Sequence, residues 1–192
     1  WLTAFPPGQL RSTIIDPVGL GENFSAFMHL KDYDDALISG RILTEEQAID
    51  QRLMHISEQI EHILQSYLRN EFATLAEYNR AAGEVAEPYH LLVIADFPTN
   101  FSEESARRLL NIMRTGPRCG IWTVIGINNE AQLPQAFENV DLEKMATVWK
   151  WKQGGFHPGL AGLEKLVVAS DELPPHDELS RSLRQFGELA RA

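Results

Sequence analysis

The chain has 192 residues, of which 44% are hydrophobic and 23% are charged, and this balance excludes a disordered or collagen-like protein. Its 27 acidic and 17 basic residues give a formal net charge of −10, which disfavours strong nucleic-acid binding by this chain alone. A single cysteine, Cys119, excludes an internal disulfide, and no apolar run is long enough for a membrane span.

The first quarter of the chain predicts a loop, a strand and an irregular segment. Residues 1–11 contain two prolines and a glycine and are expected to be a linker or loop. The apolar run at 12–16 predicts a strand that stops at Pro17, because proline cannot donate to a strand ladder. Residues 18–43 mix glycine, aromatic and charged residues and are expected to form short helical turns and a brief strand.

A long amphipathic helix is predicted next. Thr44 and Gln47 have the spacing of a capping box, in which a threonine oxygen caps the first turn and the later side chain reaches back. Apolar residues then recur every three or four positions, at Ile49, Leu53, Ile56, Ile60, Ile63, Leu64 and Tyr67. A shorter helix is predicted at 75–82, ending at Gly83.

Two further strands with a helix between them indicate an α/β fold. The run at 91–95 is continuously apolar up to Asp96, which is typical of a strand buried on both faces of a parallel sheet. A helix at 102–115, capped by Asn100, and a second buried strand at 121–127 follow. We therefore predict a three-layer α/β domain with a mostly parallel sheet and flanking helices.

The last part of the chain predicts smaller elements. The alternating stretch at 146–151 indicates an edge or outer strand, and 166–169 indicates another short strand. Two prolines at 174–175 break the chain. A final helix at 177–190 is expected to place four apolar side chains on one face: Leu179, Leu183, Phe186 and Leu189.

Three polar residues are predicted at the carboxyl ends of the strands, where open α/β sheets bind ligands. Asp16 and Asp96 end their strands, and Asn128 follows the third. A carboxylate there suits Mg²⁺ or a water nucleophile, and an amide suits a phosphate sensor, although Asp and Asn at strand ends more commonly start turns. The phosphate-loop pattern Gly-x-x-x-x-Gly-Lys-Ser/Thr does not occur in the chain.

Other reactive residues give weaker signals. His55 and His62 are seven apart on the long helix, a spacing that favours a surface role over metal binding. No base is visible near Cys119, which favours a small buried residue. Trp149 and Trp151 share one side of a predicted strand, and packing against a neighbouring helix is their commoner use. No metal site is predicted.

The order of several segments resembles that of a known family. Ile14 to Pro17 matches a strand that follows a phosphate-loop helix, and Leu-Ala-Glu-Tyr-Asn at 75–79 matches a recurrent helix motif. The segments at 87–97 and 120–125 match a Walker B strand and a sensor strand, with Asn128 near the usual sensor glutamine. Over about residues 12–155 the chain resembles the FtsK/SpoIIIE DNA-pumping ATPases, which are RecA-like P-loop NTPases.

The resemblance also implies that catalytic parts are missing. In that family the Walker B strand ends in Asp-Glu, where Asp binds Mg²⁺ and Glu activates water. This chain reads Ala95-Asp96-Phe97, so one of the two roles is empty in either alignment. Asn128 replaces the sensor glutamine, Asn129 replaces the basic residue after it, and the Walker A lysine is absent. We therefore expect no ATP hydrolysis by this chain alone.

These expectations describe a degenerate ATPase module over residues 12–170 of a longer motor protein for DNA translocation or segregation. Residues 171–192 are expected to lead to a following module, and the chain does not begin with Met. ATP and Mg²⁺ are expected in the parent protein but not for this fragment. Expected partners are other ATPase modules, further copies of the motor, and DNA through other modules, in the cytoplasm.

Three alternatives remain open from the sequence. One is an active ATPase module whose Walker A loop lies upstream of Trp1. Another is a module of a type VII secretion motor that moves polypeptides. The third is an unrelated α/β domain of flavodoxin or Rossmann type that binds a small molecule, although no glycine fingerprint supports it.

Overall fold

The computed structural model describes residues 4–5, 8–33, 37–38, 40–69, 71–172 and 174–190. The strands are β1 (Leu10–Ile15), β2 (Tyr89–Phe97), β3 (Ile121–Ile127), β4 (Trp149–Lys152) and β5 (Gly155–Pro158). The α-helices are α1 (Glu46–His62), α2 (Leu75–Ala82), α3 (Glu103–Thr115), α4 (Gln135–Glu138) and α5 (His176–Ala190). The 3-10 segments are η2 (Gly19–Asp32), η4 (Gly83–Val85), η5 (Gly116–Cys119) and η6 (Leu142–Lys144), and η3 (Ile63–Leu68) is a π-helix.

Three parallel strands form the main sheet in the order β1-β2-β3, so β2 lies in the middle. Ile14 pairs with Val93, which pairs with Val124. Successive side chains point to opposite faces: Ile15 and Ile94 belong to the larger core cluster, whereas Ile14 and Val93 belong to the smaller one. The predicted strand at 91–95 is therefore packed on both faces.

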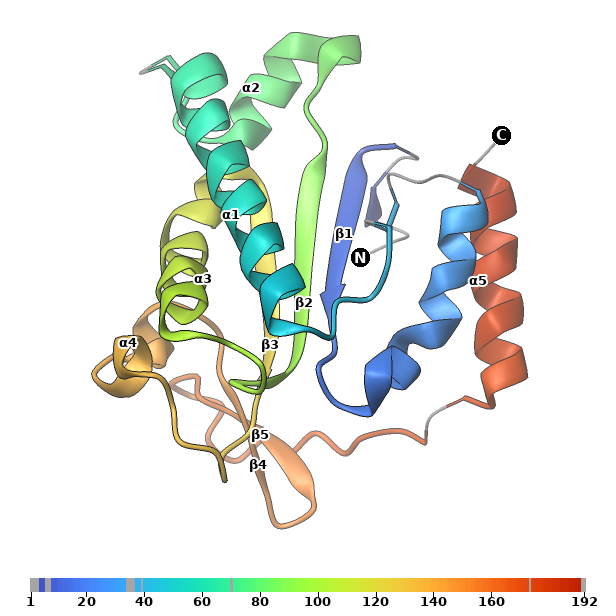
Figure 1. The fold of residues 1–192 in the computed structure, drawn as a ribbon, viewed down its shortest axis with the longest axis vertical. Coiled ribbons are helices and arrows are strands. Elements are labelled where there is room, and N and C mark those ends of the chain that lie inside the picture. The colour runs from blue at the N-terminus through green and yellow to red at the C-terminus, as the bar shows by residue number, and fades with distance from the viewer. Residues whose placement is uncertain are drawn as a thin grey trace.

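Helices cover both faces of the sheet, which confirms the predicted three-layer α/β architecture. Figure 1 shows α1, α2 and α3 on one face, and α5 beside the blue helix η2 on the other. The larger core joins α1 and α3 to the sheet through residues such as Leu53, Leu92 and Leu109, and the smaller core joins η2 to α5 through Leu30 and Leu183. Among the described residues, no helix is both long and apolar enough to cross a membrane.

The long helix predicted from Thr44 is present, but the predicted capping box is wrong. Helix α1 begins at Glu46, its N-cap is Glu45, and no side chain caps it. The backbone N–H of Leu43 still donates to the carbonyl of Ile14, so the chain remains extended up to this point and the helix starts later. The predicted apolar stripe is buried against the sheet, at Ile49, Leu53, Ile56 and Ile60, and η3 continues the helix.

Helix α2 has the predicted bounds, and two reciprocal hydrogen bonds cap its N-terminus. The Thr74 hydroxyl accepts a hydrogen bond from the Glu77 backbone N–H at 3.3 Å, and the Glu77 carboxylate accepts one from the Ala73 N–H at 2.8 Å. Leu75 is completely buried beneath the helix. Gly83 ends it with a φ of 61°, a backbone conformation that favours glycine.

Asn79 and Tyr67 tie α2 and η3 to the segment before β2. The Asn79 side chain donates to the Glu87 carbonyl at 2.8 Å and accepts from the Glu87 N–H at 2.9 Å. The Tyr67 hydroxyl donates to the Glu87 carboxylate at 2.6 Å, and this bond raises the pKa of Tyr67 to about 12. The Leu-Ala-Glu-Tyr-Asn motif thus caps a helix and fixes the entry to β2.

His90 is a buried polar residue on β2, facing α1. Its Nε2 lies 2.9 Å from the Thr13 hydroxyl, and its Nδ1 lies 3.3 Å from Gln59 Oε1. Burial, with the charges of Arg52 and Arg11, lowers the pKa of His90 to about 4. Because the Gln59 oxygen can only accept, Nδ1 carries the proton and Nε2 accepts from Thr13. The ring is therefore neutral at pH 7.

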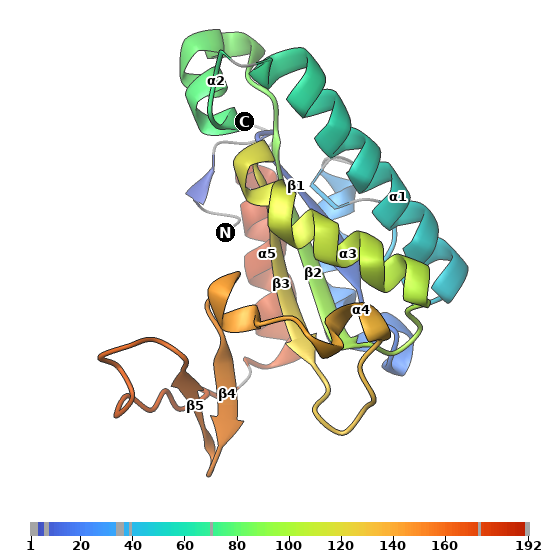
Figure 2. The ribbon, with the colours of Figure 1, turned by 90° about the vertical axis from the view of Figure 1, so that its left-hand side faces the viewer.

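The predicted outer strands form a small separate hairpin. Strands β4 and β5 pair antiparallel, and Figure 2 shows them projecting away from the main sheet. Trp149 and Trp151 are exposed, and Trp151 meets the Phe156 ring edge-on, so the expected packing against a helix is wrong. The predicted strand at 166–169 is also wrong, because only Val168 makes a bridge, to Phe156.

Helix α5 confirms the last predicted helix but not all of its apolar face. Leu183 is buried, and Leu179 and Phe186 pack against the smaller core with η2. Leu189 is 68% exposed, so it does not belong to this face. The helix therefore packs back onto the domain that contains β1.

Candidate functional site

The three sequence-predicted site residues lie at the carboxyl ends of the parallel strands. Asp16 follows β1 and Asn128 follows β3. Asp96 is the penultimate residue of β2, which continues to Phe97 rather than ending at Asp96. The structure brings Asp96 and Asn128 together but pairs Asp16 with a different residue.

Asp96 is turned toward β3 by an irregularity in the sheet. The register of β2 against β3 shifts between Ile94 and Phe97, and Asp96 has a φ of 52°. Aspartate tolerates this left-handed conformation better than most residues, and strand irregularities re-aim side chains. Its carboxylate accepts from the Thr99 hydroxyl at 2.7 Å and from the Asn128 side chain at 3.3 Å.

Asn128 uses both ends of its amide inside the protein. The Nδ2 donates to Asp96, and the Oδ1 accepts from the Glu130 backbone N–H at 3.0 Å. Its own backbone N–H donates to the carbonyl of Phe97 at 2.8 Å. The bonds to Asp96 and Phe97 hold the turn after β3 against the end of β2, and the bond from Glu130 lies within that turn.

Asp16 belongs to the loop between β1 and η2. Its carboxylate accepts from the Asn23 side chain at 3.2 and 3.5 Å, and its backbone N–H donates to the Leu43 carbonyl. Asp16 is 0% exposed. Within the described residues no hydrogen bond joins it to Asp96 or Asn128.

Sequence reasoning missed Thr99 and Asn23, the two donors that hold the carboxylates. A hydroxyl three residues after an aspartate is a common turn partner, and this signal was available for Thr99. Asn23 lies seven residues after Asp16, beyond a kink in η2 at Leu20 and Gly21. No local spacing rule predicts that contact.

The residues at this edge do not fit a complete Mg²⁺–ATP site. Asp16 has no exposed surface, and each Asp96 oxygen already accepts one hydrogen bond, which leaves one lone pair on each. Mg²⁺ needs carboxylate oxygens that it can reach together with water and phosphate oxygens. Phe97, at the position of a catalytic base next to Asp96, is buried in the core. In this structure the Asp96 and Asn128 side chains make hydrogen bonds to each other and to their own turns.

The other reactive residues carry no site. Cys119 is completely buried, and burial raises the pKa of its thiol, so the nucleophilic thiolate is disfavoured. His55 and His62 are exposed, as predicted. In the part of the chain that the structure describes, no three His, Cys, Asp or Glu side chains gather where they could hold a metal ion.

Comparison with known proteins gives structural matches. No family model and no curated protein matches the sequence. EssC from Geobacillus thermodenitrificans (ATPases 2 and 3) matches with a TM-score of 0.67 and 16% identity, over 99% of this chain and 40% of that chain. The monomer form of the pCW3 conjugation coupling protein TcpA with ATPγS matches with a TM-score of 0.62 and 14% identity, over 98% and 58%.

A third solved structure also matches this chain at low sequence identity. Thermomonospora curvata EccC (ATPases 2 and 3), in complex with a signal sequence peptide, gives a TM-score of 0.58 and 17% identity, over 96% of this chain and 37% of that chain. The chain therefore has the RecA-like fold of these ATPases, as the sequence resemblance implied. It spans 40% of the EssC chain and 58% of the TcpA chain.

Proposed function

We propose that this chain is a non-catalytic, regulatory ATPase-like module of an FtsK/SpoIIIE-type motor. The observation that carries the proposal is the bonding of Asp96 and Asn128 to each other and to their own turns. Asp96 and Asn128 take the positions of the Walker B and sensor residues, but their side chains hydrogen-bond to nearby turns. In a catalytic site these side chains would have to be available to Mg²⁺, water and phosphate. Phosphoryl transfer depends on preorganised charge around the phosphate, and this edge supplies little of it.

The proposed role is to support active modules rather than to hydrolyse ATP. The EssC and EccC structures that this chain resembles contain two ATPases each. We place this module in a cytoplasmic motor that has other ATPase modules, assembles as a homo-oligomer, and uses ATP and Mg²⁺ in those modules. The exposed rings of Trp149, Trp151 and Phe156 supply apolar surface for packing against a neighbouring module.

Hydrolysis by the purified chain tests the proposal. Phosphate release is measured with ATP and Mg²⁺ for the chain and for Asp96→Asn, with Glu104→Gln on the exposed face of α3 as a matched control. We expect all three proteins to release phosphate at the rate of buffer. Mg²⁺-dependent release that Asp96→Asn abolishes and Glu104→Gln leaves intact would contradict a non-catalytic module.

One observation favours an active module as the second candidate function. In the described part of the chain, β3 pairs only with β2, and its other edge has no strand beside it. Val124, in the middle of β3, is 47% exposed. An open edge of a buried parallel sheet has room for a further strand, and a strand that carries a Walker A loop would complete a nucleotide site there.

The parent gene separates the two candidates. The active module requires a Gly-x-x-x-x-Gly-Lys-Ser/Thr sequence within a few tens of residues before Trp1. The regulatory module requires an intact phosphate loop and Asp-Glu strand in another module, with none directly upstream of this one.

A further inference from the structure

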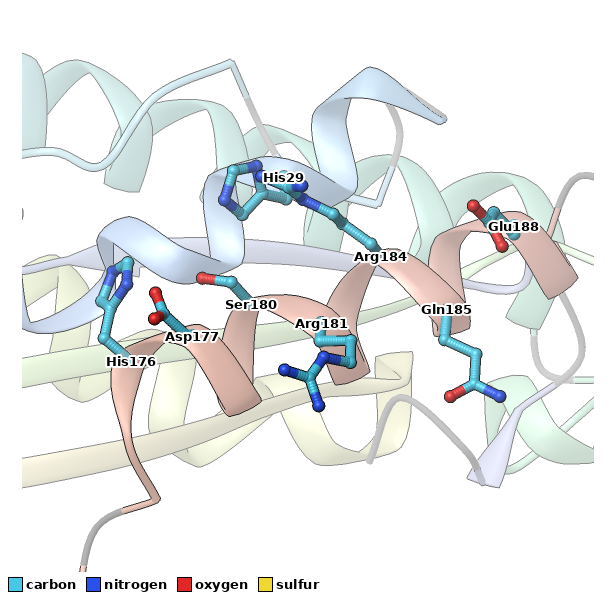
Figure 3. A pocket seen from close by; sticks show the side chains of 8 residues that line it. All are labelled: His29, His176, Asp177, Ser180, Arg181, Arg184, Gln185 and Glu188. Carbon is cyan, nitrogen blue, oxygen red and sulfur yellow. The ribbon is translucent and has the colours of Figure 1, made fainter.

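A polar groove runs between η2 and α5, on the sheet face opposite α1 and α3. Its volume is about 660 Å³, and Figure 3 shows its lining. The lining residues come almost entirely from α5: His176, Asp177, Ser180, Arg181, Arg184, Gln185 and Glu188, with His29 from η2. Asp16, Asp96 and Asn128 are not among the lining residues, and Figure 1 shows α5 beside η2 on one face of the sheet.

The two walls of the groove are held in place by packing. Leu183 is 6% exposed and lies with Leu30 in the smaller core. Gly187 lies against the Tyr33 ring so closely that a Cβ would overlap it. A glycine inside a helix is unfavourable, and here it permits the close approach of η2. The lining side chains therefore project from a fixed pair of helices.

Two arginines and a histidine line this groove. Arg184 extends from α5 toward His29, whereas Arg181, one turn earlier on the same helix, points away from them in Figure 3. Among the described residues neither arginine nor His29 forms an ion pair or a side-chain hydrogen bond. The planar donors of these guanidinium groups match the oxygens of a phosphate.

Ser180 adds a second, independent observation. It is 8% exposed and lies between Asp177 and Arg184 on α5, and its Oγ has no hydrogen-bond partner among the described residues. Buried hydroxyls normally have a partner. This Oγ is itself buried, so it reaches an acceptor in the groove only after rotation about χ1.

Two acidic residues in the lining limit the size of the anion that the groove can bind. Asp177 and Glu188 lie near opposite ends of the groove, eleven positions apart on α5, which is about 16 Å along a helix. A nucleic-acid backbone or a triphosphate would extend toward one of these carboxylates. We propose that the groove binds the phosphate group of a small phosphomonoester, with Arg184, His29 and Ser180 as its ligands.

Titration of the purified chain with defined anions tests the site. Glycerol 3-phosphate is the probe, and inorganic phosphate, acetate and ATP are titrated in parallel while backbone amide NMR shifts of α5 are followed. We expect saturable shifts with glycerol 3-phosphate and inorganic phosphate, and affinities at least tenfold weaker for acetate and ATP. Equal or tighter binding of acetate or ATP, or shifts that do not saturate, would overturn the assignment.

Variants locate the ligands. Arg184→Gln is expected to weaken glycerol 3-phosphate binding at least tenfold, whereas Arg114→Gln, an exposed arginine on α3, leaves it unchanged. Ser180→Ala is expected to weaken binding several-fold without lowering the urea midpoint, because its hydroxyl makes no bond in the unliganded protein. An affinity that Arg184→Gln or Ser180→Ala leaves unchanged would remove that residue's assigned role.

Discussion

Single polar side chains in this protein join backbone segments that are distant in sequence. Asp96 and Asn128 link the ends of β2 and β3 through one hydrogen bond, although they are 32 residues apart. Asn79 makes two hydrogen bonds to the Glu87 backbone. In a sequence, such residues can be mistaken for catalytic residues, because Asp and Asn are also common residue types in active sites. Their partners decide which reading is correct.

Asn79→Ala is expected to lower the free energy of unfolding by about 1–3 kcal/mol, because the Glu87 N–H and carbonyl both lose their partner. Urea denaturation at pH 7 measures the change. Asn111→Ala on the exposed surface of α3 is the control and should change stability by less than about 0.5 kcal/mol. Equal effects of the two variants would show that the Asn79 bonds contribute nothing.

The lowered pKa of His90 leads us to expect that the stability of the protein depends on pH. Its pKa is lowered from 6.5 in the unfolded chain to about 4 in the folded protein, so the unfolded state binds more protons between these values. Stability is fully present above about pH 6.5 and is lost as the pH falls toward 4, by about 1 kcal/mol per pH unit.

Chemical denaturation of the protein and of His90→Gln from pH 7 to 4.5 measures this dependence. Glutamine keeps a donor and an acceptor but does not titrate, so the variant should lose less stability than the parent over this range. Parallel losses in both proteins would assign the acid sensitivity to other groups.

For helices and strands, tertiary contacts explain which elements were predicted correctly from the sequence and which helix caps were not. Continuous apolar runs predicted β2 and β3, and the threefold to fourfold spacing predicted α1, because burial on a sheet imposes those patterns. The two predicted helix caps, Thr44 and Asn100, are both wrong, because α1 begins only at Glu46 and Ser102 caps α3. The Asn100 side chain donates to the Thr44 carbonyl at 2.8 Å, across 56 residues.

The caps that do form are local, so sequence had signals for them. Ser102 accepts from the Ser105 N–H and starts α3, a pattern of a serine before an acidic first turn. At the site, the positions of Asp16, Asp96 and Asn128 were predictable from strand ends. Their partners were not, because Asn23 and the β2 irregularity depend on how loops pack.

Helix α5 gives a prediction at the same scale. Gly187→Ala places a methyl group into the Tyr33 ring, so α5 should loosen from η2 although alanine favours helix by about 1 kcal/mol. Hydrogen–deuterium exchange across α5 measures this, with exposed Ser182→Ala as the control on the same helix. Faster exchange is expected only in Gly187→Ala, and slower exchange there would show that helix propensity outweighs the contact.

The whole molecule combines an ATPase-like fold with strand ends that hold loops. Its fold is similar to that of solved ATPase structures, with TM-scores of 0.58 to 0.67 at 14–17% identity. The acidic net charge and the bonded Asp96 and Asn128 both argue for a supporting role in a larger machine. Among the described residues, one edge of β3 has no neighbouring strand, and the alternative of an active module depends on this open edge.

The most direct test of this account is the ATPase rate of the full-length parent motor with Asp96→Asn in this module. Removing one carboxylate charge should leave the rate nearly unchanged if this module does not hydrolyse ATP. Circular dichroism and the urea midpoint establish that the variant is folded. A rate that collapses in a folded motor would contradict the account and would make Asp96 a catalytic residue.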